Sequence, residues 1–270
     1  DRQWSRGLGD VYKRQIYGVV ALSLAFFAYN KGLPLSIRSI FYPILGDRAW
    51  GWAGHIVDIL AVLATLFGLA TSLGLGAQQA ASGIHHVFGL DAGMGLQIVV
   101  ITVVTLLAVV SVVRGIDGGV KVISNINMIV AFLLLILVAL IGYAVAFGNI
   151  GTTLMAYVEN IIPLSNPHGR QDEAWFQGWT VFYWAWWISW SPFVGMFIAR
   201  VSKGRTVREF MTAVLLVPTV VTLLWMSVFG GIAIDQVVNN IGELGANGLT
   251  DVSLAMFQMF DVLPFGTVLS

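Results

Sequence analysis

Long runs of apolar residues, separated by short polar segments, dominate the chain. Five runs have about the 20 residues needed to cross the hydrocarbon core of a bilayer. They cover residues 53–76, 95–113, 122–147, 176–198 and 211–234. A shorter run covers residues 16–29, and the connecting segments are rich in glycine, proline and charged residues, which is typical of loops. The pattern predicts an all-α, polytopic helical membrane protein.

Lysine and arginine are concentrated in alternate loops. Outside residues 1–15 the chain has ten basic residues, and nine of them lie at 31–48, 114–121 and 200–208, on one side of an alternating topology. The opposite loops contain Arg170 and several acidic residues. Because loops with an excess of Lys and Arg stay in the cytoplasm, the bias fixes the orientation in the cell inner (plasma) membrane. The runs at 16–29 and 176–198 then both run inward.

Two segments do not follow the span pattern. Residues 1–15 (DRQWSRGLGDVYKRQ) are polar and hold four of the fourteen basic residues, but they lack the apolar core and cleavage site of a signal peptide. We interpret them as a non-native junction, with a cytoplasmic tail as the alternative, and residues 16–270 as the membrane domain. Residues 153–164 (TLMAYVENIIPL) are too short to span and partly amphipathic, which predicts an interfacial helix on the outer face.

Composition narrows the chemistry further. The chain is 57% hydrophobic and 10% charged, with a net charge of zero, so nothing favours nucleic acid as a partner. The chain has no cysteine, which excludes disulfides and thiol catalysis. The four histidines are scattered, and the adjacent His85 and His86 would point to different sides of a helix or strand, which gives little support to a metal site. We therefore expect no metal centre and no cofactor. An acid within a membrane run is a functional candidate, but Asp58 lies near the end of its run and is expected to be a solvated end residue or a helix N-terminal acid.

Four tryptophans fall within seven positions of the stretch FYWAWWISWSPF (182–193). At 100° per residue an arc of about 120° collects Tyr183, Trp186, Trp187, Trp190, Phe193 and Phe197. Lipid is as apolar as these rings, so burial alone does not explain the wall of indoles. A cation without hydrogen-bond donors, such as a quaternary ammonium, is the ligand that stacked indoles suit best. Bulky helix packing is the alternative, and spacing leaves both open.

Small and hydroxyl-bearing residues mark two of the runs. Pro192, inside the tryptophan run, removes one backbone hydrogen bond and predicts a kink. In VDILAVLATLFGLATSLGLGAQQ (57–79), Gly68 and Ser72 have the spacing that lets helices approach closely. Thr65 and Thr71 in the same run carry hydroxyls that could also ligate a hard cation. A tight helix interface is the favoured interpretation of this run.

The segment WTVFYWAWWISWSPFVGMFIARVSKGRTVREF (179–210) resembles the betaine/choline/carnitine transporter family. The resemblance extends, less densely, through residues 57–79 and RGIDGGVKVISNINM (114–128) and covers the chain from Ile16 onward. It implies a twelve-span secondary transporter with a ten-helix inverted-repeat (LeuT-like) core. The chain would supply the fourth to ninth spans, a partial transporter domain that is not expected to transport by itself. The family resemblance also implies a homotrimer.

The resemblance assigns roles to individual residues. Trp187 matches a tryptophan of the family's box around a trimethylammonium group, and Tyr17, in IYGVV, matches the tyrosine of that box. Trp186 and Trp190 match positions that line the pathway or the substrate. The two residues that match one sodium site are Phe193 and Thr65. Leu69 departs from the family, which has a second threonine ligand there.

The implied function is import of a quaternary-ammonium solute such as glycine betaine, choline or carnitine by symport, with sodium as the coupling ion. The mechanism is alternating access, with the solute held by cation–π contacts in the bilayer. One alternative is another inverted-repeat transporter for an amine or amino acid. Others are a helical membrane protein whose tryptophans only pack and a membrane-embedded enzyme with a metal at His85 and His86.

Overall fold

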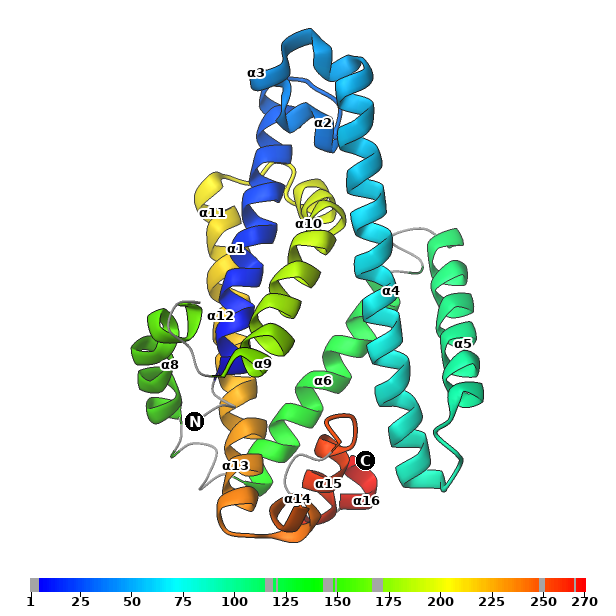
Figure 1. Ribbon diagram of the computed structural model, residues 1–270, viewed down its shortest axis with the longest axis vertical. Helices are drawn as coiled ribbons and strands as arrows, with labels where there is room; N and C mark the ends of the chain where they lie inside the picture. The colour runs from blue at the N-terminus through cyan, green and yellow to red at the C-terminus, as the bar shows by residue number, and fades with distance from the viewer. Residues whose placement is uncertain are drawn as a thin grey trace. The chain divides into compact units, whose positions relative to one another are not determined.

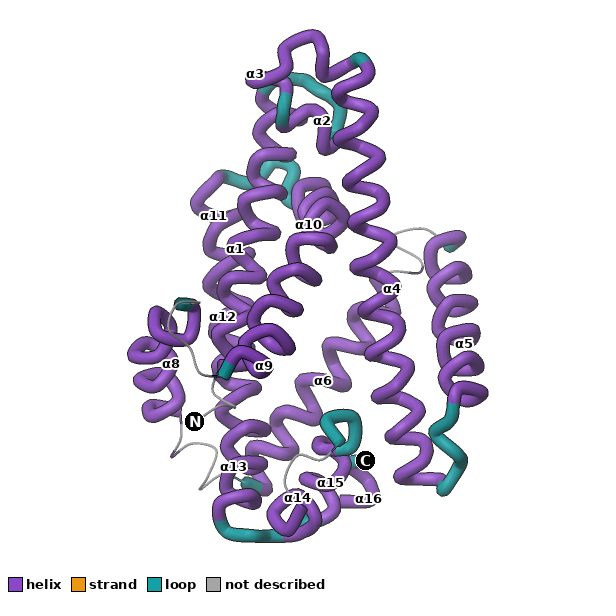
Figure 2. The backbone as a smooth tube through the Cα atoms, viewed as in Figure 1, coloured by secondary structure: helices purple, strands orange, loops and turns teal. Residues whose placement is uncertain are grey.

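The computed structural model describes residues 5–114, 119, 121–142, 148, 150–166, 172–247, 251–264 and 266–270. Within these residues every regular element is a helix and there is no strand, so the predicted all-α class is confirmed (Figures 1 and 2). Residues 1–4 of the predicted junction, residues 143–147 of the third long run and Arg170 lie outside the described residues.

The helices follow the apolar runs, and several extend beyond them. The longer elements are α1 (Ser5–Ala25), α4 (Trp52–Phe88), α5 (Met94–Val113), α6 (Lys121–Ile141), α8 (Ile150–Ser165) and α10 (Phe182–Val201). Continuous helix from Val207 to Val238 comprises α11 (Val207–Met211), η5 (Thr212–Leu216), α12 (Val217–Trp225), η6 (Met226–Gly230) and α13 (Gly231–Val238). The remaining pieces are η1 (Phe26–Asn30), α2 (Ile37–Ile40), α3 (Tyr42–Leu45), η2 (Gly46–Trp50), α9 (Glu173–Trp175), η4 (Phe176–Val181), α14 (Gly242–Asn247), α15 (Ala255–Asp261) and α16 (Gly266–Leu269).

Helix α4 passes the end predicted for its run at residue 76. Gly74 and Gly76 lie inside the helix, consistent with the frequency of glycine in membrane helices. The helix ends at Phe88, where Gly89 adopts a left-handed conformation (φ +69°) and donates its N–H to the carbonyl of His85 at 2.8 Å. This is a glycine C-cap, which satisfies a carbonyl of the last turn.

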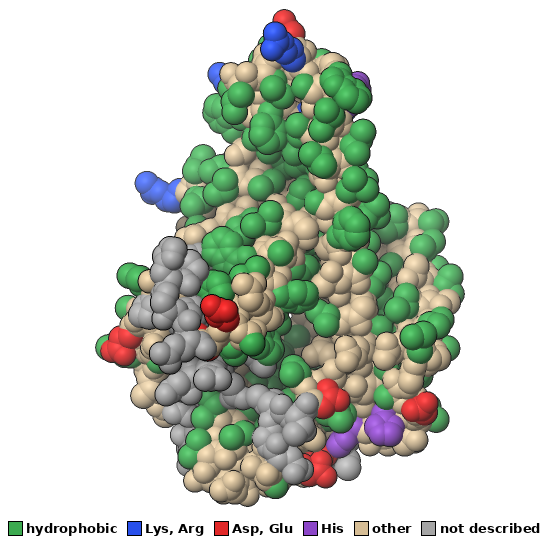
Figure 3. Space-filling view, in the orientation of Figure 1, with side chains coloured by type: hydrophobic (Ala, Val, Ile, Leu, Met, Phe, Trp, Pro, Cys, Tyr) green, Lys and Arg blue, Asp and Glu red, His purple; other side chains and the backbone are tan. Residues whose placement is uncertain are grey.

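Apolar side chains are spread over the face of the protein drawn in Figure 3. Within the described residues, four helices are long and apolar enough to cross a membrane, namely Trp52–Phe88, Met94–Val113, Lys121–Ile141 and Val207–Val238. Only 6% of the most apolar window of Met94–Val113 is buried inside the protein. An exposed apolar surface of this extent requires lipid around it. The chain is therefore a multi-pass membrane protein.

The chain divides into two compact units. The first comprises residues 1–71 and 154–223, and the second comprises residues 72–153 and 224–270. The buried core of the second unit consists of Leu135, Val138, Val228, Phe229, Ile232, Leu244, Met259, Phe260 and Leu269. The tryptophan helix lies in the first unit, where it packs along α1.

The contact between α1 and α10 depends on small residues. The buried residues of α10 recur every four positions, at Trp187, Ser191, Gly195 and Ala199, and so form one stripe along the helix. The two helices run in the same direction (Figure 1). A methyl group placed on Gly195 would lie 2.6 Å from Cγ1 of Val20, so only glycine fits at this crossing.

Substitution of Gly195 by valine is expected to destabilise the protein by about 1–3 kcal/mol, because the added carbons overlap the α1 side chain at the crossing. Thermal unfolding of the purified full-length protein in detergent measures the change. The matched control is Gly178→Val, at a helical glycine in the same unit where a methyl group meets no described atom within 4 Å. Equal melting temperatures for the two variants would contradict the proposed tight crossing.

Candidate functional site

The tryptophans of α10 face two different neighbours. Trp187 is 7% exposed and belongs to the buried stripe that packs on α1. Trp186 instead points toward α4, where its Nε1 donates to the carbonyl oxygen of Gly68 at 3.2 Å. Trp190 lies over the same glycine, since a methyl group on Gly68 would be 3.0 Å from Cδ1 of Trp190. The aromatic residues that the sequence places on one arc of α10 therefore face two different helices, α1 and α4.

The rings of α10 contact one another along the helix. The Tyr183 ring centroid lies 5.6 Å from that of Trp186 and 5.6 Å from that of Trp187. Trp190 and Phe193 are stacked with a centroid separation of 6.3 Å. Nε1 of Trp190 is enclosed and has no hydrogen-bond partner among the described residues. The helix therefore presents connected aromatic faces and one indole donor that a ligand could use.

Tyr17 lies on the face of α1 that packs on α10, with 1% of its surface exposed. The crossing of Gly195 over Val20 fixes the register of the two parallel helices. Counting back one turn on each helix places Tyr17 level with Ser191. Trp187 lies one further turn back on the buried stripe of α10, so the two residues assigned to the box are buried about one turn apart along the α1–α10 pair.

Pro192 does not leave an open carbonyl in the middle of α10. A proline at this position cannot donate to the carbonyl of Ile188, four residues earlier. The hydroxyl of Ser191 donates to that oxygen instead, at 2.8 Å. The helix continues through the proline to Val201. The serine next to the proline therefore has a structural explanation.

The two candidate ion-site residues lie on the facing helices α4 and α10. These helices run in opposite directions (Figure 1), so Thr65 and Phe193 both lie one turn to the same side of the Gly68 contact. The Thr65 hydroxyl donates to the carbonyl of Ala61 at 2.8 Å, which leaves its oxygen able to accept or ligate. Leu69, in place of the family's second threonine, is 41% exposed and supplies no oxygen.

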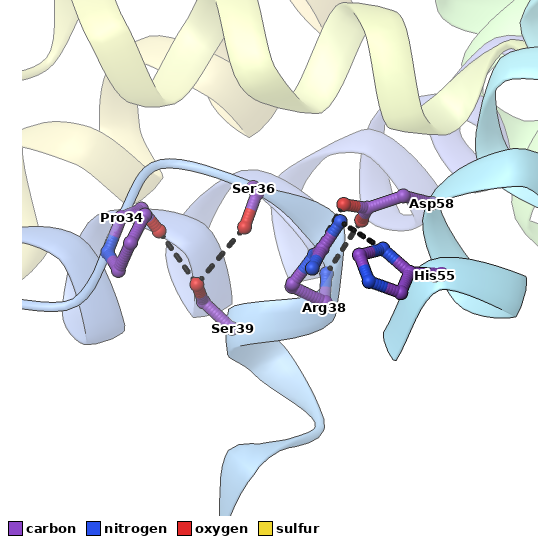
Figure 4. A network of polar contacts seen from close by, with 6 residues as sticks. All are labelled: Pro34, Ser36, Arg38, Ser39, His55 and Asp58. Carbon is purple, nitrogen blue, oxygen red and sulfur yellow. Dashed lines mark hydrogen bonds and ion pairs between the residues drawn. The ribbon is translucent and has the colours of Figure 1, made fainter. Parts of the chain in front are cut away.

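Asp58 is paired with a basic residue, which corrects the expectation of a solvated helix-end acid. Its carboxylate accepts from the backbone N–H of Arg38 at 3.1 Å and from Nε of the same residue. Nη2 of Arg38 lies 3.3 Å from Nδ1 of His55, and Ser39 donates to the carbonyl of Pro34 (Figure 4). This network ties the loop after α1 to the start of α4. The sequence analysis did not predict this ion pair, although the opposite charges of Arg38 and Asp58, twenty residues apart, could have indicated it.

The two adjacent histidines have separate partners. Nδ1 of His85 lies 2.7 Å from the carbonyl oxygen of Leu90, and Nε2 of His86 lies 3.0 Å from Oδ1 of Asp261. The ring of His86 also contacts Phe257, at 5.7 Å between centroids. No group of three or more His, Cys, Asp or Glu suited to a metal occurs in the part of the chain that the structure describes. Only His86 joins α4 to α15, within the second unit, whereas His85 contacts the segment that follows α4.

The chain is similar to known membrane transporters. The family model for the betaine/carnitine/choline family transporter matches residues 12–270. A glycine betaine transporter of Vibrio parahaemolyticus is 89% identical over 255 residues, which are 94% of this chain and 49% of the relative. A glycine betaine/proline/choline/ectoine transporter of the same organism is 72% identical over 260 residues, which are 96% of this chain and 46% of the relative. The glycine betaine transporter OpuD of Bacillus subtilis is 46% identical over 224 residues, which are 82% of this chain and 44% of the relative.

The chain spans about half the length of the curated relatives that it matches. The family is one of transporters and not of enzymes, and its model accounts for both compact units of the chain. With helices of membrane-spanning length and an aromatic-lined contact between α1 and α10, this chain belongs to the betaine/carnitine/choline transporter family.

Proposed function

We propose that this chain is part of a secondary transporter in the plasma membrane that imports a quaternary-ammonium solute such as glycine betaine or choline. The observation that carries the proposal is the burial of both Tyr17 and Trp187 on the packed helix pair α1 and α10. The names of the relatives, which are glycine betaine and choline transporters, support this class of substrate.

Binding follows from the chemistry of the rings. A trimethylammonium group has no hydrogen-bond donor, so the electron-rich faces of Tyr17 and Trp187 would attract it by cation–π contacts. Each contact contributes about 0.5–2 kcal/mol, with the larger values in a site that excludes water. The enclosed Nε1–H of Trp190 would donate to the carboxylate of a betaine. On the α4 side, the ring faces of Trp186 and Trp190 would line the pathway and add cation–π contacts to the solute.

Transport would proceed by alternating access within an inverted-repeat core, with one bundle of helices moving against the rest. We propose sodium as the coupling ion, near Thr65 and Phe193. The residues at this position fit a sodium site only in part, since Thr65 supplies an oxygen ligand and Leu69 does not. A homotrimer surrounded by lipid is the proposed assembly, and it rests on the family resemblance.

A broader substrate range is a second candidate. One relative is named a transporter of glycine betaine, proline, choline and ectoine, and another of glycine betaine, proline and choline. These solutes share a cationic nitrogen, and most share a carboxylate. A site with indole faces and one indole N–H would accept several of them with different affinities.

Uptake of radiolabelled solutes tests the proposal. The full-length protein is expressed in a bacterium that lacks its own betaine and choline uptake systems. We expect saturable accumulation of betaine or choline above the empty-vector control, with proline competing less well. Absence of uptake for betaine, choline and carnitine, with the protein present in the membrane, would refute the proposed function.

A further inference from the structure

We propose that Gly68 is a positioning residue for the indole wall: the bare backbone of α4 at this point holds Trp186 and Trp190 in the orientations that bind substrate. The inference rests on the transport function proposed above. Gly68 belongs to α4, whereas the residues assigned to the substrate site belong to α1 and α10. It is buried, and all of its contacts described here lie within the first compact unit.

Space at Gly68 is limited on the side that faces α10. A methyl group there would lie 3.0 Å from Cδ1 of Trp190, 3.1 Å from Oγ of Ser189 and 3.3 Å from Cα of Trp190. Two of these atoms belong to Trp190, and one of the two is its backbone Cα. The indole of Trp190 therefore rests directly on the α4 backbone, and any side chain at position 68 has to displace the ring or the helix.

The Gly68 carbonyl also orients the neighbouring indole. Its oxygen accepts the Nε1–H of Trp186 at 3.2 Å, which fixes the plane and direction of that ring. A hydrogen bond between helices in a membrane has no water to replace it. Gly68 thus contacts both tryptophans. Its lack of a side chain allows Trp190 to approach the α4 backbone, and its carbonyl accepts the hydrogen bond from Trp186.

Ring orientation matters because the attraction between a cation and an indole acts through the ring face. A ring that turns or shifts presents its edge to the cation. Other glycines of the same helix do not have this role. A methyl group on Gly74 meets no described atom within 4 Å, so Gly74 provides a matched control on α4.

The test uses Gly68→Ala, Gly68→Val and Gly74→Val in the full-length protein. We expect the KM for betaine to rise about fivefold in the alanine variant and about twentyfold in the valine variant, which corresponds to weakening one or two cation–π contacts. The maximal rate per protein molecule should change less than about twofold, because binding is affected more than the transport step. Gly74→Val should leave KM unchanged. Unchanged KM in both Gly68 variants would overturn the proposal.

Trp186→Phe separates positioning from packing, since it keeps an aromatic ring and removes the N–H donor. Trp186→Phe alone should raise KM. In the Gly68→Val background it should have little further effect, because both changes remove the same contact. Fully additive effects of the two changes would contradict a shared role.

A spectroscopic readout keeps the inference distinct from the proposed function. The full-length protein is labelled with 5-fluorotryptophan, and the ¹⁹F resonance of residue 186 is assigned from its loss in Trp186→Phe. We expect this resonance to shift in Gly68→Ala and to stay in place in Gly74→Val. If the shift occurs but no substrate is transported, the positioning is correct and the proposed function is wrong. If the resonance does not move, the positioning role is refuted whatever the transport result.

Discussion

Replacement of Trp187 by leucine is expected to raise the KM for betaine uptake by about tenfold or more, since the substitution removes a cation–π face from a buried contact. Trp187 is 7% exposed and lies on the buried stripe of α10, whose Gly195 crosses α1, the helix that carries Tyr17. Uptake of labelled betaine by the full-length protein measures the effect. Trp187→Phe should have a smaller effect, because it keeps an aromatic face at the same position.

Two controls separate binding from folding in this experiment. Trp184→Leu, at a tryptophan that is 36% exposed and on the edge of the arc, should leave KM near its original value. Since a smaller side chain at a buried site also leaves a cavity, the melting temperature of each variant is measured. An unaltered KM and rate in Trp187→Leu would mean that this tryptophan only packs, and the box hypothesis would fail.

Exchange of sodium for potassium in the assay buffer is expected to reduce betaine uptake to the level of the empty-vector control. If Thr65 is a sodium ligand, Thr65→Val should raise the sodium concentration for half-maximal uptake roughly tenfold, the effect of one lost oxygen contact to a charged group. Valine has the shape of threonine and lacks only the hydroxyl. Sodium titrations of initial uptake rates provide the measurement.

Thr71→Val is the matched control for Thr65→Val. Its hydroxyl donates to the carbonyl of Phe67 at 2.9 Å, the same local bond that Thr65 makes with Ala61, so both substitutions cost the helix the same contact. Thr71 is on a different face of α4, and its replacement should not change the sodium dependence. Equal uptake in sodium and potassium would favour an exchanger or a proton-coupled transporter. Leu69→Thr should strengthen sodium dependence if the ion binds here.

The described structure also changes the interpretation of the aromatic arc. Trp186, Trp187 and Trp190 fall on one arc by spacing, and this alone suggested a single wall. In the structure Trp187 packs toward α1, whereas Trp186 and Trp190 contact α4 at Gly68. A substrate held between α1 and α10 would therefore be separated from α4 by two indoles whose placement depends on a glycine.

The sequence by itself determined the all-α class, the membrane location and the residue types of the candidate site. These follow from local properties, because the length of an apolar run and the absence of charge decide whether a segment can exist in lipid. The family resemblance of residues 179–210 could likewise be recognised from consecutive residues, and the family model confirms the family.

Only the tertiary structure decided which neighbour each side chain meets. The pairing of Asp58 with Arg38 and the contact of Gly68 with two tryptophans depend on geometry that periodicity does not contain. In lipid the hydrophobic effect does not select one apolar face over another, so close packing at small residues and individual hydrogen bonds make that choice. Gly195 and Gly68 illustrate the reason: each lacks a side chain, and its role becomes visible only when the opposing helix is in place.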